Sequence, residues 1–228
     1  MSAPISVVVP VLGAEGLGPC LAALAEGVLE GAVCEVILAD AGLDPRVSEI
    51  AEAVGAALVT AEKGRGRQLA AGAEAARGAW LLVVHGDTVL GEGWARAALA
   101  HLHNAPRTAG YARLAFDDTA VLARLTAGWA NLRSALFGLP YGDQGLLISA
   151  ALYREIGGYR PLPLMEDVDL VRRLGRARLK PLATLATTSA ERYRREGWLR
   201  RGGRNLGTLA LYLAGVSPER LLRRYERR

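Results

Sequence analysis

Asp87 ends a segment, Trp80–Asp87, in which an apolar run stops at a histidine, a glycine and an aspartate. The run is rich in valine and leucine and is long enough for one buried strand. Ligands of open parallel α/β sheets bind just beyond the carboxyl ends of the strands, so Asp87 is a candidate metal or phosphate-site residue. Gly86 lets a ligand or another backbone come close. The alternative is that Asp87 only starts a turn.

Other polar residues follow apolar runs in the same way. Asp40 ends the run 34–40, and the loop 63–68 combines two glycines with three basic residues. A nucleotide bound at a sheet edge needs a partner for its base and ribose, cations for its phosphates and a carboxylate for a metal. Asp40, the loop 63–68 and Asp87 match these needs in kind, and the glycines of the loop let backbone amides approach an anion.

The elements that must position these residues alternate through the first half of the chain. Strands are expected at 5–11, 34–40, 56–60 and 80–85, and helices at 15–30, 45–54, up to Arg77, and 92–104. Alternation of this kind predicts parallel pairing with right-handed crossovers. After about residue 107 the alternation changes. Strands are expected at 111–116, 146–149 and 182–188, and helices at 118–137, from a start within 161–169, and from about 199. We therefore predict one α/β domain over 1–228, with a nucleotide-binding half (1–106) and a second half (107–228).

Composition narrows the class of protein. The chain has 228 residues, of which 51% are apolar, so it is long enough and apolar enough for a globular core. Its two cysteines, Cys20 and Cys34, imply no disulfide framework. No run approaches the ~20 apolar residues of a membrane span, and the first strand starts almost at once, so we expect a cytosolic protein without a secretory leader.

The net charge of +5 belongs to the C-terminal tail. Residues 191–228 carry eleven arginines and four glutamates, a balance of +7, which leaves −2 for the rest of the chain. The tail combines an apolar stretch, 206–216, with arginines. We expect it to pack on the core, with a dimer interface or an anionic membrane surface at the inner face as the alternatives. Nucleic acid is disfavoured, because no aromatic stacking platform accompanies the arginines.

Glu166 and Asp167 form a second carboxylate pair. Acidic residues in the first turn of a helix also satisfy free amides and the helix dipole, and the prolines before this pair favour a helix start. Asp169, with a nearby arginine, fits that structural role. The residues alone leave function and structure open for the pair.

Two other enzyme classes compete. A dinucleotide-binding dehydrogenase should carry G-x-G-x-x-G after its first strand, whereas Gly13, Gly16 and Gly18 follow a strand-ending proline in another pattern. A nucleotidyltransferase on a similar sheet should carry a glycine-rich first loop with an arginine and a lysine, and the segment 12–18 has neither basic residue.

Taken together, the motifs resemble the family 2 glycosyltransferases with the GT-A fold. The resemblance runs through most of the chain, on Ser6–Pro10, Asp40, Arg65–Gln68, His85–Asp87, Gly142–Gln144, Met165–Asp169 and Thr188–Arg194. Gly138–Gln144 combined with Pro163–Val168 resembles a bacterial branch, the arsenosugar-biosynthesis-type glycosyltransferases. The implied fold is a mostly parallel central sheet flanked by helices, with a smaller acceptor-side region and C-terminal helices.

The resemblance also implies roles for individual residues. Asp87 would be the metal-binding carboxylate of the D-x-D motif, although His85 stands where the broad family has the first aspartate. Asp167 would be the general base, with Glu166 orienting it or binding the acceptor. Asp40 would contact the uracil or ribose. The further residues implied in nucleotide or substrate binding are Pro10, Val11, Leu12, Glu15, Lys63, Arg65, Arg67, Gln68, His85, Gly86, Asp143, Gln144, Arg192, Arg194 and Arg195.

The implied reaction is an inverting, metal-dependent transfer from a nucleotide sugar, expected to be a UDP-sugar, to a small-molecule or lipid-linked acceptor. Direct displacement at the anomeric carbon requires a base, because the attacking hydroxyl must lose its proton. One protein carboxylate is enough for Mg²⁺ or Mn²⁺ when diphosphate oxygens and water complete the shell. The alternative from another class is a non-catalytic nucleotide-sugar-binding protein, which His85 favours and the carboxylates Asp87, Glu166 and Asp167 oppose.

Overall fold

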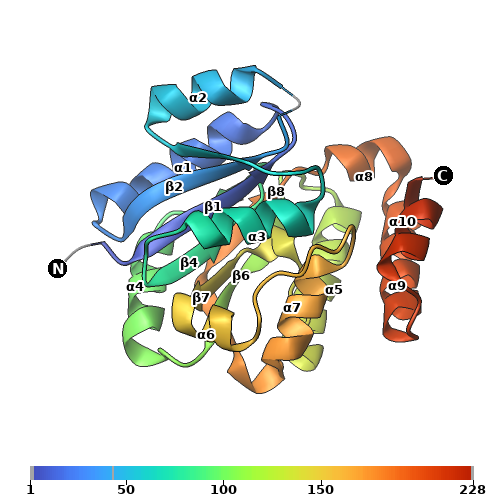
Figure 1. Cartoon of the computed structure of the whole chain (residues 1–228). Helices are drawn as coiled ribbons and strands as arrows, with labels where there is room; N and C mark the ends of the chain where they lie inside the picture. The colour runs from blue at the N-terminus through green and yellow to red at the C-terminus, as the bar shows by residue number, and fades with distance from the viewer. Residues whose placement is uncertain (1–2, 43, 227–228) are drawn as a thin grey trace.

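The computed structural model describes residues 3–42 and 44–226. Over these residues a single sheet of eight strands, in the order β3-β2-β1-β4-β7-β6-β8-β5, lies between layers of helices (Figure 1). The strands are β1 (Ile5–Val11), β2 (Val33–Asp40), β3 (Ala57–Thr60), β4 (Trp80–Val83), β5 (Thr88–Leu90), β6 (Ala109–Phe116), β7 (Leu146–Ser149) and β8 (Leu179–Thr188). The helices are α1 (Leu17–Leu29), α2 (Arg46–Val54), α3 (Arg65–Ala75), α4 (Trp94–Asn104), α5 (Val121–Phe137), α6 (Ala150–Glu155), α7 (Glu166–Leu174), α8 (Glu191–Glu196), α9 (Trp198–Leu213) and α10 (Pro218–Glu226).

The central strand β1 is buried on both faces, because successive side chains of a strand point to opposite sides of the sheet. Val7 and Val9 belong to a core shared with α1, α2 and α4, whereas Val8 belongs to a second core shared with α3, α6 and α7. Such a strand has no solvent-facing side, which explains why its sequence is apolar apart from the buried Ser6. The predicted α/β architecture is confirmed.

The first four strands place their carboxyl ends at one edge of the sheet. β1 pairs in parallel with β2 and β4, and β2 pairs in parallel with β3. The register sets Val11 beside Asp40, and Asp40 beside Thr60. Residues that follow these strands are therefore brought together at this edge, as expected for a ligand site.

The second half of the chain continues the same sheet. β7 pairs antiparallel with β4 and β6, and β6 pairs in parallel with β8. The short strand β5, which the sequence analysis missed, pairs antiparallel with β8 just after Asp87. β4 ends at Val83 instead of His85, so the histidine lies in the loop beyond the strand.

The C-terminal helices contact the core, as expected for the tail. Leu209 of α9 is 5% exposed and Leu221 of α10 is 2% exposed, and both belong to the core on the α7 side of the sheet. Figure 1 shows α9 and α10 side by side at the end of the molecule where α8 lies. No helix among the described residues is long and apolar enough to cross a bilayer.

Candidate functional site

A cleft of about 980 Å³ opens at the carboxyl edge of the sheet. Its walls come from segments far apart in the sequence: the loop after β1, the start of α3, the loop after β4, the segment 141–143, the segment 161–167 and the helices α8, α9 and α10. Of the residues predicted from the sequence, the cleft is lined by Leu12, Lys63, Arg65, Arg67, His85, Asp87, Asp143, Glu166, Asp167 and Arg192. Asp87 and Asp167, eighty positions apart, thus face one cavity.

Asp87 is exposed to this cleft from the loop between β4 and β5. The backbone of Gly16 lies against it, because a Cβ built on Gly16 would be 3.4 Å from the Asp87 Cα. Gly16 also has φ of 77°, a conformation that favours glycine. A side chain at position 16 would therefore strain the first loop, and its Cβ would lie in van der Waals contact with Asp87.

Asp167 is held by two backbone amides at the start of α7. The Gly142 N–H donates to its Oδ2 and the Val168 N–H donates to its Oδ1, both at 2.7 Å. Met165, two residues earlier, has φ of 65°, the only positive φ among the described non-glycine residues. Such a conformation costs of order 1 kcal/mol and persists where the surroundings fix it. The turn at Met165 thereby directs the first residues of α7 toward the cleft.

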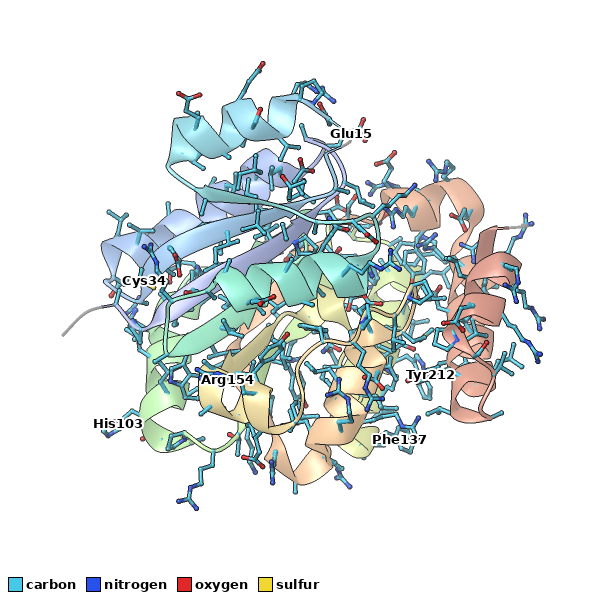
Figure 2. The ribbon with its side chains drawn as sticks, in the orientation of Figure 1. Glu15, Cys34, His103, Phe137, Arg154 and Tyr212 are labelled. Carbon is cyan, nitrogen blue, oxygen red and sulfur yellow. The ribbon has the colours of Figure 1, made fainter. Side chains whose placement is uncertain are left out.

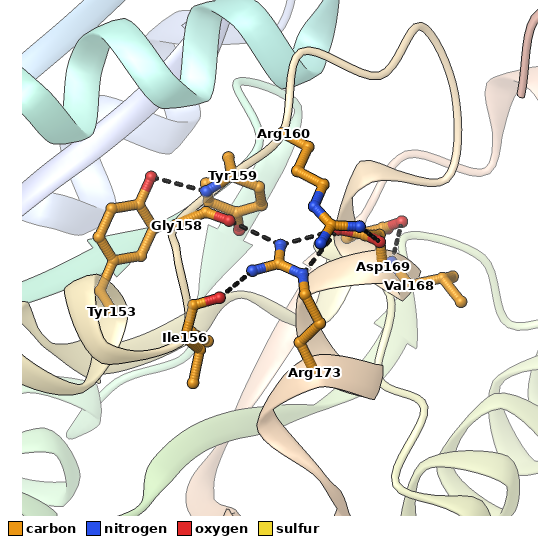
Figure 3. Close-up of polar contacts among 9 residues, drawn as sticks. Tyr153, Ile156, Gly158, Tyr159, Arg160, Val168, Asp169 and Arg173 are labelled. Carbon is orange, nitrogen blue, oxygen red and sulfur yellow. Dashed lines mark hydrogen bonds and ion pairs between the residues drawn. The ribbon is translucent and has the colours of Figure 1, made fainter.

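The helix that carries Asp167 is anchored on its far side by Asp169. Arg173 and Arg160 both pair with Asp169, at 2.7 and 3.2 Å, and Arg173 also donates to the carbonyls of Ile156 and Gly158 (Figure 3). These contacts fix α7 to the loop that leads into it. Asp169 thus pairs with a nearby arginine, as expected, and its ion pairs serve the structure around α7.

Glu166 lies deeper than Asp167 and is only 1% exposed. Burial, with the Asp167 charge adding to it, raises the pKa of the Glu166 carboxyl to about 7. Its Oε1 lies 3.6 Å from Nη1 of Arg65. The Glu166 side chain therefore forms an ion pair with Arg65 at the wall of the cleft.

Arg65, at the start of α3, is the cation that the acidic residues share. Burial lowers its pKa, but the charges of Glu166, Asp167, Asp87 and Asp143 outweigh that effect and raise it. The guanidinium side chain is 43% exposed, so part of it faces the open cleft. A diphosphate group bound in the cleft could form an ion pair with the Arg65 guanidinium.

His85 and Asp167 approach each other across Gly142. A Cβ on Gly142 would lie 2.3 Å from Nε2 of His85 and 3.4 Å from Oδ2 of Asp167. Burial, together with the positive charges of Arg65 and Arg192, lowers the pKa of His85 well below 6.5, so the imidazole is neutral at pH 7. Its Nε2 is buried beside Gly142 without a hydrogen-bond partner among the described residues.

Two residues near Asp143, Arg133 and Tyr141, were missed by sequence reasoning. Burial raises the pKa of Asp143 to about 6, although the nearby positive charge of Arg133 opposes the rise. Arg133 is buried on α5, donates to the Leu139 carbonyl at 2.9 Å and stacks over the Tyr141 ring at 3.5 Å. Tyr141 stands inside a predicted motif and could have been found. Arg133 lies in the middle of an apolar helix, where no sequence signal points to the cleft.

Several predicted residues do not line the cleft, and two of them support the backbone instead. Gln68 is 1% exposed and donates to the carbonyls of Val11 (2.6 Å) and Ala39 (2.8 Å), so it ties the ends of β1 and β2. Gln144 is fully buried, accepts from Ser134 at 2.6 Å and donates to the Ala112 carbonyl at 3.1 Å. The others outside the lining are Pro10, Val11, Glu15, Asp40, Gly86, Arg194 and Arg195.

Three of these outlying residues are placed clearly. Asp40 is 6% exposed at the end of β2, and its Oδ1 is buried without a hydrogen-bond partner. Arg194 pairs with Asp118 at 3.2 Å, so it joins α8 to the segment that follows β6. Glu15 is exposed at the surface (Figure 2).

The far end of the cleft is aromatic and polar. Phe116 packs edge-on against Tyr193 and Trp198, with 5.1 Å between ring centroids in each pair, and Tyr193 stacks on Trp198 at 4.7 Å. Asn205 of α9 donates to the Tyr193 hydroxyl at 3.1 Å. Sequence reasoning did not single out these residues. The C-terminal helices thus form one wall of the cleft, in contact with the end of β6.

The acidic residues of the cleft could hold a hard divalent cation only together with oxygen atoms of a bound ligand. Among the described residues, no three His, Cys, Asp or Glu side chains lie close enough to hold a metal ion. Asp87 offers exposed carboxylate oxygens in an oxygen-rich cleft, and Mg²⁺ and Mn²⁺ take such ligands together with phosphate oxygens and water. A metal held by Asp87 and a diphosphate is compatible with this arrangement.

Solved structures with this fold include several glycosyltransferases. S. aureus TarS 1-349 in complex with UDP-GlcNAc has a TM-score of 0.60 and 15% identity over 81% of this chain and 58% of that one. Glucosyl-3-phosphoglycerate synthase from Mycobacterium tuberculosis, in complex with Mn²⁺, UDP and phosphoglyceric acid, has a TM-score of 0.55 and 19% identity over 82% and 69%. The chain thus spans roughly three fifths to two thirds of their length. The match confirms the expected GT-A architecture.

Comparison at the sequence level agrees with the fold. A search of curated proteins found no match. The family model "Glycosyl transferase family 2" matches residues 6–146, more than half of the chain. The chain therefore belongs to glycosyl transferase family 2.

Proposed function

We propose that this protein transfers a sugar from a nucleotide-sugar donor, a UDP-sugar, to an acceptor hydroxyl with inversion at the anomeric carbon. The observation that carries the proposal is that Asp87 and Asp167 line one cleft. The negative charges of both residues also raise the pKa of Arg65, which lines the same cleft. Family membership and the solved complexes with UDP and UDP-GlcNAc support a nucleotide-sugar donor. Direct displacement needs a base and a stabilised leaving group on opposite faces of the sugar.

Asp167 is the proposed general base. Each of its oxygens accepts one backbone amide, so the carboxylate keeps a fixed orientation and retains lone pairs for an acceptor hydroxyl. The base takes the hydroxyl proton as the new bond to the anomeric carbon forms. Neutral His85, which lines the cleft beside Gly142, is a proposed contact to the donor sugar.

The leaving diphosphate meets a group of cations. Lys63, Arg65, Arg67 and Arg192 line the cleft and neutralise the charge that develops on the leaving group. Asp87 is the proposed metal ligand, and a bound Mn²⁺ or Mg²⁺ would neutralise further diphosphate charge. Asp40, with a buried unpartnered oxygen at the end of β2, is the proposed contact to ribose or uracil.

Finer aspects of the assignment rest on the sequence motifs. The arsenosugar-biosynthesis-type branch, the single-domain organisation and a cytoplasmic location, with peripheral contact at the inner face of the membrane as an alternative, are part of the proposal. The proposed acceptor is a small molecule or a lipid-linked molecule.

The test uses a panel of nucleotide sugars with Mn²⁺ or Mg²⁺, with binding followed by calorimetry and donor hydrolysis by chromatography. Asp87→Ala should lose metal-dependent binding. Asp167→Asn should bind the donor normally but turn over 10²- to 10⁴-fold more slowly. Glu30→Gln, exposed at the end of α1, is the matched control and should change neither. Unchanged binding in Asp87→Ala with unchanged turnover in Asp167→Asn would refute the assignment. Donor binding without hydrolysis in any form would instead favour the non-catalytic alternative.

A further inference from the structure

Helix α5 buries its small residues and exposes its large apolar ones. The side facing the protein carries Ala123, Ala127 and Ala130, each at most 9% exposed. The opposite side carries a stripe of large apolar residues that are 40–63% exposed: Val121, Leu122, Leu125, Trp129, Leu132, Leu136 and Phe137. An ordinary surface helix has the reverse arrangement, with its large apolar stripe toward the core. Phe137, at the end of this stripe, lies at the edge of the molecule (Figure 2).

The neighbouring helix α9 contacts α5 and also exposes large apolar residues. Leu199, Leu206 and Leu213 recur every seven residues and are 79%, 50% and 47% exposed. None of the exposed residues of either helix lines the cleft. Scattered apolar residues on a surface need no explanation, but stripes on two contacting helices are typical of an interaction surface.

The charge on the two helices has one sign. Within 121–137 and 198–213 there are five arginines and no aspartate or glutamate. Two of the arginines, Arg124 and Arg200, are exposed, and no described carboxylate lies within ion-pair distance of either. The apolar stripes are therefore accompanied by unpaired positive charge.

We infer that the exposed face of α5, with α9 beside it, docks on an anionic lipid surface. The large side chains would enter the boundary between headgroups and acyl chains, while Arg124 and Arg200 meet lipid phosphates. A second copy of the chain is the other simple occupant. A two-fold interface would bring the same arginines together with no carboxylate on these helices to oppose them, which disfavours that occupant.

The surface can be tested with the full chain and sedimented vesicles of phosphatidylcholine, with or without phosphatidylglycerol. We expect binding that depends on phosphatidylglycerol and weakens with salt. The double variant Leu125→Gln/Trp129→Gln should reduce the partition coefficient at least tenfold, and Arg124→Gln should reduce it roughly fivefold on anionic vesicles alone. Leu29→Gln, at an 87%-exposed leucine at the end of α1, is the matched control.

Tryptophan fluorescence gives a second readout. Trp80 and Trp94 are buried and Trp198 is stacked on Tyr193, so a blue shift on vesicle binding should come from Trp129 and vanish in Trp129→Phe. Absence of vesicle binding, or equal binding by the double variant, overturns the inference. So does a micromolar dimer in sedimentation that the double variant abolishes, because a second copy then covers the face. None of these outcomes depends on glycosyl transfer.

Discussion

Glu166 is the residue whose ionisation should control stability near neutral pH. Its carboxyl pKa is about 7 in the fold because of burial and the Asp167 charge, against an ordinary value of 4.5. A raised folded pKa favours the folded state below pH 4.5, and that contribution is lost as the pH rises through 7. Relative to Glu166→Gln, the wild type should therefore lose on the order of 1–3 kcal/mol of unfolding free energy between pH 4.5 and 8. Urea unfolding at several pH values measures the difference, and a pH-independent difference would contradict this account.

Gln68 and Gln144 show where residue-level prediction stopped. The sequence located the motifs that build the cleft, because acidic and basic residues after apolar runs mark the carboxyl edge of a parallel sheet. The sequence could not distinguish a glutamine that contacts substrate from one that is hydrogen-bonded to two backbone segments. The residue type and its place in the motif are the same in both cases. The difference depends on which carbonyls lie within reach, and only the folded arrangement of Val11, Ala39 and Ala112 decides that.

The position of α7 depends on the arginine that anchors it. Arg173 is 18% exposed at its side chain and joins Asp169 to two carbonyls, whereas Arg160 pairs with the same carboxylate but is 57% exposed. Arg173→Met should therefore destabilise the protein by about 3 kcal/mol, because it leaves buried acceptors unpaired. Arg160→Met, the matched control, should cost at most about 1 kcal/mol. Thermal unfolding compares the two variants, and equal losses would contradict the anchoring role of Arg173.

At the scale of elements, periodicity predicted where helices form but not which way they face. The spacing of Val121, Leu125 and Trp129 correctly indicates a helix over most of 118–137, yet these side chains point to solvent and the alanines pack inward. The spacing of apolar residues identifies a stripe along a helix. It does not show whether another element of the protein covers that stripe. The three-residue strand β5 was missed because so short a segment has no periodicity, and its pairing with β8 comes from tertiary structure.

The two halves of the molecule share one sheet and cannot be separated at residue 106. β4 from the first half is hydrogen-bonded to β1 on one side and to β7 on the other, and β5 pairs with β8 near the end of the chain. The cleft likewise takes its walls from both halves. We therefore expect the described fold to unfold as one cooperative unit, with tryptophan fluorescence and far-UV circular dichroism giving coincident curves in urea.

Variants on the two faces of the sheet test this cooperativity. Leu24 of α1 is 1% exposed in one core, and Leu170 of α7 is fully buried in the other. Each change to alanine should cost about 2–5 kcal/mol and should move the same single transition in both signals. If the halves were independent domains, Leu24→Ala would shift one of two transitions and Leu170→Ala the other. A shared transition would mean that a loss of packing behind α1 also weakens the α7 side of the cleft, since neither wall could remain folded without the other.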